Sequence, residues 1–209
     1  VESIKSSFDV TAGYDYQYWK STTPLYSEMN TLGEIQKTSK AKDERHVLLS
    51  YYGRLNYSFD SRYMLTTTIR RDATSRFAKN VRWGTFPSVA LGWRVTEESF
   101  LKDNKVLSNL KLRASYGVTG QQDGIGNYNY LPIYTQSQNG AEASMGNGYI
   151  HTYRPSSYVP DLKWETTTSW NVGFDFGFLK DRITGSFDYY TRQTKDLIAT
   201  VPAAAGTTF

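Results

Sequence analysis

The sequence predicts an all-β protein, a fragment of about seven strands from an antiparallel transmembrane β-barrel. Three observations support this prediction. Apolar side chains alternate with polar ones along segments such as residues 162–178, which is the two-residue period of a strand with one wet face. That alternation lasts roughly three times as long as an average strand. The connections between such segments are alternately short and long, as they are in outer-membrane barrels.

Seven segments carry the alternation and are expected to be strands. They are residues 4–19, 45–60, 63–70, 87–95, 110–119, 162–178 and 183–192. Pro87 stands at the start of its segment, where a missing backbone N–H is tolerated. Tight turns are expected near Asp60 and over residues 179–182. Bacterial barrels normally close with an even number of strands, so an odd number predicts a fragment.

The remaining connections are longer. Polar composition predicts loops over residues 21–44 and 72–84, and a stretch rich in glycine and tyrosine predicts a very long loop over 121–161. Another connection contains Thr96, which is able to accept an early amide hydrogen bond, followed by two glutamates that suit the positive end of a helix. This arrangement predicts a short helix over residues 99–104.

Alternation also assigns each side chain to one of two faces. The face expected to contact lipid carries Leu112, Tyr116, Trp170, Val172, Phe174 and Phe176. The opposite face carries Lys111, Arg113 and Asn171 and is expected to face water. Three tryptophans near the long-loop ends of strands predict an outer aromatic girdle at the membrane interface. They are Trp19, Trp83 and Trp164.

Composition narrows the class of protein. The chain has 17 Tyr, 10 Phe, 5 Trp and no Cys, which suits an all-β protein without disulfides or a structural zinc site. No apolar run approaches the roughly 18 residues of a spanning helix. The net charge of +4 comes from basic residues spread along the chain and is weak support for a nucleic-acid partner. Residues 1–5 lack a signal-peptide pattern, so we expect either a protein that is not exported or an internal piece of a longer chain.

No catalytic, cofactor or metal site is expected. His46 and His151 are far apart and have no cysteine or carboxylate partner at metal-ligand spacing. Gly124 and Gly126 are not followed by the third glycine of a dinucleotide fingerprint, because Asn129 stands in that place. The sequence also contains no G-x-S-x-G nucleophile elbow. We therefore expect that this segment is not an enzyme.

Soluble alternatives remain open, namely a large β-sandwich or an all-β module that binds nucleic acid or carbohydrate. Arginine and aromatic residues together suit a stacking platform for nucleic acid. Such a platform places both kinds of residue on one face, whereas Lys111 and Arg113 oppose the face of Leu112 and Tyr116. This segregation favours lipid on one side of the sheet and water on the other.

Several motifs, spread over nearly the whole chain, resemble one known family. They are Arg70-Arg71-Asp72 with Ser75-Arg76-Phe77, Arg82-Trp83-Gly84-Thr85-Phe86-Pro87-Ser88-Val89, Leu91-Gly92-Trp93-Arg94, Leu107-Ser108-Asn109-Leu110-Lys111-Leu112-Arg113-Ala114-Ser115-Tyr116-Gly117, Gly120-Gln121, Ile125-Gly126-Asn127-Tyr128, Leu162-Lys163-Trp164-Glu165-Thr166 and Asp188-Tyr189-Tyr190. Together they closely resemble the C-terminal part of the barrel in SusC/RagA-type TonB-dependent outer-membrane transporters of Bacteroidota.

The resemblance implies a barrel of about 22 strands, plugged by an N-terminal domain, in the cell outer membrane. It implies import of glycans or oligopeptides, driven through TonB, together with a SusD-like surface lipoprotein. The implied partners are thus this lipoprotein, TonB acting on an N-terminal region, membrane lipid and the substrate, with no nucleic acid and no cofactor. Residues 1–209 are expected to be part of the barrel domain, since neither a plug domain nor a TonB box is found in them. The substrate is not determined.

Six tyrosines of the long loop are expected to contact a substrate or the lipoprotein. They are Tyr128, Tyr130, Tyr134, Tyr149, Tyr153 and Tyr158. Their rings offer large and fairly rigid surfaces of the kind that suit recognition of a protein or a sugar. The competing interpretation is that they pack the loop against itself.

Overall fold

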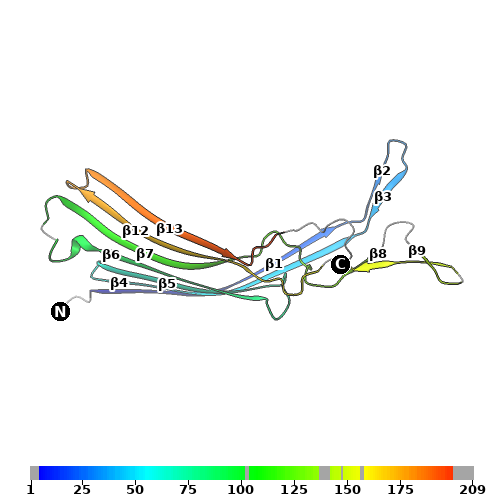
Figure 1. Cartoon of the computed structure of the whole chain (residues 1–209), viewed down its shortest axis with the longest axis horizontal. Helices are drawn as coiled ribbons and strands as arrows, with labels where there is room; N and C mark the ends of the chain where they lie inside the picture. The colour runs from blue at the N-terminus through cyan, green and yellow to red at the C-terminus, as the bar shows by residue number, and fades with distance from the viewer. Residues whose placement is uncertain (1–4, 102–103, 137–141, 147, 156–157, 200–209) are drawn as a thin grey trace.

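A computed structural model describes residues 5–101, 104–136, 142–146, 148–155 and 158–199. Within these residues the chain forms one curved antiparallel sheet of seven long strands (Figure 1). In their order across the sheet, the strands are β1 (Ser6–Thr23), β4 (Lys42–Phe59), β5 (Tyr63–Thr74), β6 (Trp83–Arg94), β7 (Leu107–Gln121), β12 (Glu165–Phe178) and β13 (Ile183–Lys195). The predicted all-β antiparallel architecture and its seven strands are confirmed. Ile4, the predicted start of the first strand, lies outside the described residues.

Tight turns join the strands at one end of the sheet. Asp60 and Ser61 both adopt positive φ between β4 and β5, which matches the twist of a hairpin and which aspartate tolerates. Residues 179–181 do the same between β12 and β13. The β6–β7 connection contains a short 3-10 helix, Val95–Glu97, and then turns. The helix predicted over residues 99–104 is therefore wrong for its described residues, because the single helical turn comes earlier; residues 102–103 lie outside the described part.

Longer connections join the strands at the opposite end. The loop predicted over residues 21–44 is wrong, because β1 and β4 both extend into it and a hairpin of β2 (Tyr26–Met29) and β3 (Ile35–Ser39) fills the rest. This hairpin projects beyond the sheet (Figure 1). The Asn30 side-chain oxygen accepts hydrogen bonds from the Leu32 and Glu34 amides and so closes its turn. Strands β5 and β6 likewise shorten the loop predicted over 72–84.

The longest connection, residues 122–164, contains four short strands. They are β8 (Tyr134–Gln136), β9 (Glu142–Ser144), β10 (Tyr149–His151) and β11 (Tyr153–Pro155). Strand β8 pairs with β11, and β9 pairs with β10, so the connection folds back on itself as two nested antiparallel ladders. Three-residue strands are too short for a recognisable alternation, which is why the sequence predicts only a loop.

Very little of the molecule is buried. The described residues include five buried hydrophobic side chains: Ala73, Phe77, Phe86, Val95 and Trp164. By contrast, large apolar side chains in the middle of the sheet are exposed, with 58% exposure for Val172 and 56% for Leu91. Among the described residues, no helix is long and apolar enough to cross a membrane. The sheet thus presents an extensive apolar face that the chain itself does not cover.

Candidate functional site

Strand register gathers large apolar side chains from all seven strands on one face, which we call the apolar face. Trp93 stands opposite Leu112, which stands opposite Phe174, and Phe174 pairs in turn with Phe187 on β13. The next row joins Leu65, Leu91, Ala114, Val172 and Tyr189. Side chains of a strand alternate between faces, so pairing in register extends one face across the whole sheet.

All six residues predicted to contact lipid lie on the apolar face. Trp170 stands opposite Tyr116, with ring centroids 4.5 Å apart, and Val172 stands opposite Ala114. Phe174 contacts its neighbours Phe176 and Phe187 at 6.0 and 5.7 Å between ring centroids. The shared face is established by the register, while contact with lipid remains a prediction.

The opposite face, which we call the polar face, is covered by hydrogen-bonded charged and amide groups. Arg113 donates to both carboxylate oxygens of Asp175, at 3.1 and 2.9 Å, and to Asp188 at 3.0 Å. Asn56 donates to Asp9 at 3.1 Å and accepts from Thr66 at 2.9 Å. Those ionic groups of the Arg113 cluster are about one-third exposed, so they stay hydrated. A surface of this kind suits an aqueous lumen.

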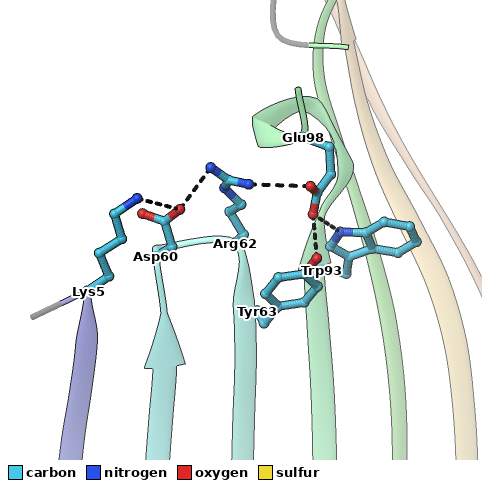
Figure 2. A network of polar contacts seen from close by, with 6 residues as sticks. All are labelled: Lys5, Asp60, Arg62, Tyr63, Trp93 and Glu98. Carbon is cyan, nitrogen blue, oxygen red and sulfur yellow. Dashed lines mark hydrogen bonds and ion pairs between the residues drawn. The ribbon is translucent and has the colours of Figure 1, made fainter. Parts of the chain in front are cut away.

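At the short-turn end of the sheet, a network of polar contacts holds two aromatic side chains of the apolar face, Tyr63 and Trp93. Figure 2 shows its six residues, Lys5, Asp60, Arg62, Tyr63, Trp93 and Glu98. Glu98 accepts from the Tyr63 hydroxyl at 2.6 Å and from the Trp93 indole N–H at 3.1 Å. Arg62 bridges Glu98 and Asp60, at 3.3 and 2.8 Å. Hydrogen bonds from Tyr63 and Trp93, together with Arg62, lower the pKa of Glu98. The rings of Tyr63 and Trp93 are stacked, and the Tyr63 hydroxyl and the Trp93 indole N–H both donate to the Glu98 carboxylate.

At the opposite end of the sheet, Phe77, Phe86 and Trp164 form a small hydrophobic core. Phe77 is fully buried, and Trp164 makes edge contacts with both Phe77 and Phe86 at centroid distances of 5.5 and 5.3 Å. The Trp164 indole donates to the Arg82 carbonyl oxygen at 2.9 Å. Phe86 packs directly over Gly120, where any side chain would collide with its ring. The core thus joins the β5–β6 connection to the start of β12.

Of the three tryptophans predicted to form an outer girdle, only Trp83 lies on the apolar face, and its place at the membrane interface remains a prediction. Its ring lies on the apolar face, stacked beside Tyr51 and under the Arg71 guanidinium at 5.0 Å. Trp164 belongs to the buried core just described. Trp19 lies on the polar face, stacked on His46. The prediction is wrong for both: position near a strand end does not fix the face, and the alternation of β1 already groups Trp19 with Asp15 and Gln17.

Arg76, from the Ser-Arg-Phe motif, holds the base of the longest connection. It donates to the side-chain oxygen of Asn127 at 3.2 Å and to the backbone oxygen of Gln122 at 3.3 Å, and it lies 3.7 Å from Asp123. In the sequence, this motif indicates only the family resemblance, and its role at the base of the connection was not predicted. Since its partners are about 50 residues away in sequence, local pattern could not reveal it.

The six loop tyrosines are divided into two groups. Tyr128 and Tyr130 are half-buried at the base, where the Tyr128 hydroxyl accepts a hydrogen bond from the Arg45 amide at 3.1 Å. The exposed group consists of Tyr134, Tyr149, Tyr153 and Tyr158. Tyr128 therefore packs the loop against the sheet. For the four exposed tyrosines, a role in recognition remains a prediction. No group of three metal-ligating side chains occurs in the part of the chain that the structure describes.

An antiparallel sheet with one uncovered apolar face and one hydrated polar face defines a segment of a membrane β-barrel wall. The family model described as "TonB dependent receptor-like, beta-barrel" matches residues 3–209. The chain belongs to this family of TonB-dependent receptors.

Individual relatives agree. The chain is 53% identical over 165 residues to "TonB-dependent receptor SusC" of Bacteroides thetaiotaomicron, covering 79% of the chain and 16% of that protein. It is 35% identical over 218 residues to "TonB-dependent receptor P39" of Formosa agariphila, covering 95% of the chain and 20% of that protein. The chain therefore spans only about a fifth of the length of these relatives or less.

Solved structures give the same result. "Structure of the RagAB peptide transporter" includes a chain that superimposes with a TM-score of 0.78 at 25% identity, covering 99% of this chain and 24% of that one. A RagAB peptide importer in the "open-open" state matches with a TM-score of 0.77 at 26% identity, covering 97% of this chain and 23% of that one. The recognition of a SusC/RagA-type barrel segment is thereby confirmed.

Proposed function

We propose that this chain forms part of the wall of an outer-membrane barrel through which a TonB-dependent receptor imports nutrients. The apolar face contacts membrane lipid, and the polar face lines the aqueous lumen. The observation that carries the proposal is the register, which keeps Trp93, Leu112 and Phe174 in one uninterrupted apolar row. A soluble β-module would have to bury such a row, whereas a barrel leaves it to lipid.

The complete receptor takes up glycans or oligopeptides in concert with a SusD-like surface lipoprotein. Support comes from the SusC relative, which is named a TonB-dependent receptor, and from the RagAB structures, which are described as a peptide transporter and importer. TonB acts through a region outside these 209 residues. The long connections of the sheet lie on the cell-surface side, where the exposed tyrosines of residues 134–158 contact substrate or lipoprotein.

Spin labels at neighbouring positions test the orientation of the wall. The segment contains no cysteine, so Val172→Cys and Asn171→Cys, made in the complete receptor, each introduce one labelling site here. In lipid vesicles, we expect oxygen, which concentrates in lipid, to speed the spin relaxation of the label at position 172. For the label at position 171, a water-soluble nickel chelate should instead speed the spin relaxation. The reverse pattern, or equal nickel access at both positions, would overturn the proposal.

A further inference from the structure

A cavity of about 520 Å³ opens on the polar face at the long-loop end of the sheet. Strands β1 and β4, the β5–β6 connection and the base of the longest connection all contribute to it. The side chains that matter most are Gln17, Trp19, Glu44, His46, Arg76 and Asp123. Its volume falls within the range of small-molecule sites. Leu48 lines this cavity and also packs against the loop-end core, so the two adjoin each other.

Trp19 forms a flat platform in this cavity. One side of its indole is covered by the imidazole of His46, with centroids 4.6 Å apart and ring planes inclined by 12°. His46 is buried and is held in turn by the Thr74 hydroxyl at 3.1 Å from its Nε2. Trp19 as a whole is nevertheless 45% exposed. A fixed aromatic ring that is exposed toward water, on the side away from lipid, is unsuited to anchoring in a membrane and suited to stacking on a ligand.

The groups around the platform favour an uncharged polar ligand. The lining contains two basic side chains, Lys20 and Arg76, and two acidic ones, Glu44 and Asp123, so their formal charges cancel. Leu48 is the single aliphatic side chain among the lining residues. The cavity therefore offers neither a net charge nor an apolar pocket of the size an aliphatic side chain would need.

Hydrogen-bonding groups are also held in place before any ligand arrives. Arg76 is fixed by Asn127 and by the Gln122 backbone oxygen. The side-chain oxygen of Gln122 is buried, and the Gln122 side chain lies within hydrogen-bonding reach of His46. The carboxylates of Glu44 and Asp123 would accept hydrogen bonds from ligand hydroxyls.

We propose that this cavity is a subsite for one ring of a neutral saccharide, stacked on Trp19. The C–H bonds on the face of a pyranose ring carry slight positive charge and match the negative face of the indole. Its hydroxyls match the balanced set of carboxylate, amide and guanidinium groups. The inference rests on the proposed function, because it requires the polar face to line the import path, and it favours a glycan over an oligopeptide as the substrate.

Fluorine NMR of the complete receptor tests the subsite. The receptor is labelled with 5-fluorotryptophan, and its Trp19 resonance is identified by its loss in Trp19→Phe. Maltohexaose, cellohexaose, xylohexaose and tri-alanine are then titrated separately. We expect at least one hexaose to shift the Trp19 resonance saturably and tri-alanine to leave it unchanged. Trp19→Ala should weaken binding of that hexaose by roughly tenfold or more.

Trp83→Ala is the matched control, because Trp83 has nearly the same exposure, 42%, but lies on the apolar face. Its affinity for the hexaose should equal that of the wild type. If no hexaose shifts the Trp19 resonance, if tri-alanine alone does so, or if both alanine variants lose affinity equally, the subsite is refuted. The spin-label pattern at positions 171 and 172 is independent of all these outcomes, so failure of the subsite is distinguishable from failure of the proposed function.

Discussion

Arg113 on β7 donates a hydrogen bond to Asp188 on β13, although β12 lies between them; the two side chains are 3.0 Å apart. Gly173 of β12 stands in register with both residues, and the absence of a side chain there leaves room for the ion pair. A Cβ atom at position 173 would approach the Asp188 carboxylate and the Phe187 carbonyl oxygen to 2.5 and 2.7 Å. One glycine therefore lets a single arginine tie three strands together on the polar face.

We expect Gly173→Ala to destabilise the receptor by about 1 to 3 kcal/mol, since the new methyl group must displace the Asp188 carboxylate or the β13 backbone. Gly117→Ala is the control, because a Cβ atom there meets nothing closer than Ser88 at 3.5 Å. It should be neutral or slightly stabilising. Urea unfolding of both variants in lipid vesicles measures the difference. Equal urea midpoints for the two variants would mean that the Arg113–Asp188 contact over Gly173 does not contribute to stability.

Opposite faces should respond differently to a charge. Val172→Arg is expected to cost roughly 2 to 4 kcal/mol if the residue lies near the bilayer midplane, because the guanidinium would lie in lipid. Asn171→Arg should cost much less, since its side chain stays hydrated. Refolding titrations of the complete receptor in vesicles compare the two. A similar penalty at both positions would contradict the assignment of faces.

The Glu98 network should make the short-turn rim sensitive to acid. Because its pKa is lowered in the folded protein, Glu98 stabilises fully above its ordinary pKa, and the stabilisation is lost as the pH falls through the lowered value. We therefore expect the wild type to unfold at higher temperature than Glu98→Gln at pH 7, with the gap narrowing below about pH 4.5. The measurement is thermal unfolding from pH 7 to pH 3.

Glu97→Gln serves as the control for the acid experiment, because Glu97 is exposed and contributes nothing to the network in Figure 2. Its melting temperature should follow that of the wild type at every pH. A constant gap between the wild type and Glu98→Gln from pH 7 to pH 3 would argue that the carboxylate does not act through its charge.

The loop-end core should hold the longest connection in place. Phe77→Ala removes a fully buried ring and is expected to cost about 3 to 5 kcal/mol of local or global stability. Phe100→Ala, at a site that is 71% exposed, should cost little. Limited trypsin digestion reports the local effect, since Arg154 lies in the connection. Faster cleavage there in Phe77→Ala alone would support the anchoring role, and unchanged cleavage would oppose it.

The outer part of that connection should serve recognition. Replacing residues 132–154 with a short Gly/Ser linker removes Tyr134, Tyr149 and Tyr153 but keeps the base held by Arg76 and Tyr128. We expect normal insertion of the barrel with weaker capture of the lipoprotein or weaker substrate uptake. Co-purification and uptake assays in cells, at matched receptor abundance, measure both. If both were normal, the tyrosines would be dispensable surface.

How much of this protein is predictable from its sequence depends on whether the signal is local. The two-residue period is local, because each side chain of a strand points to the face opposite its neighbours. The sequence therefore determined the long strands, the tight turns near Asp60 and residue 180, and the membership of the apolar face, including Trp170 and Tyr116. It also determined the family, through motifs that span nearly the whole chain.

Tertiary structure decided everything that depends on pairing between distant segments. Register placed Gly173 between Arg113 and Asp188, and the fold-back of the longest connection brought its base to Arg76. Alternation along the sequence is enough to place Trp19 on the polar face. Its stacking on His46, and the cavity beside it, arise only because β1 pairs with β4. The physical reason is that hydrogen-bonded register and loop packing are set by the whole sheet at once, whereas alternation needs only the next residue.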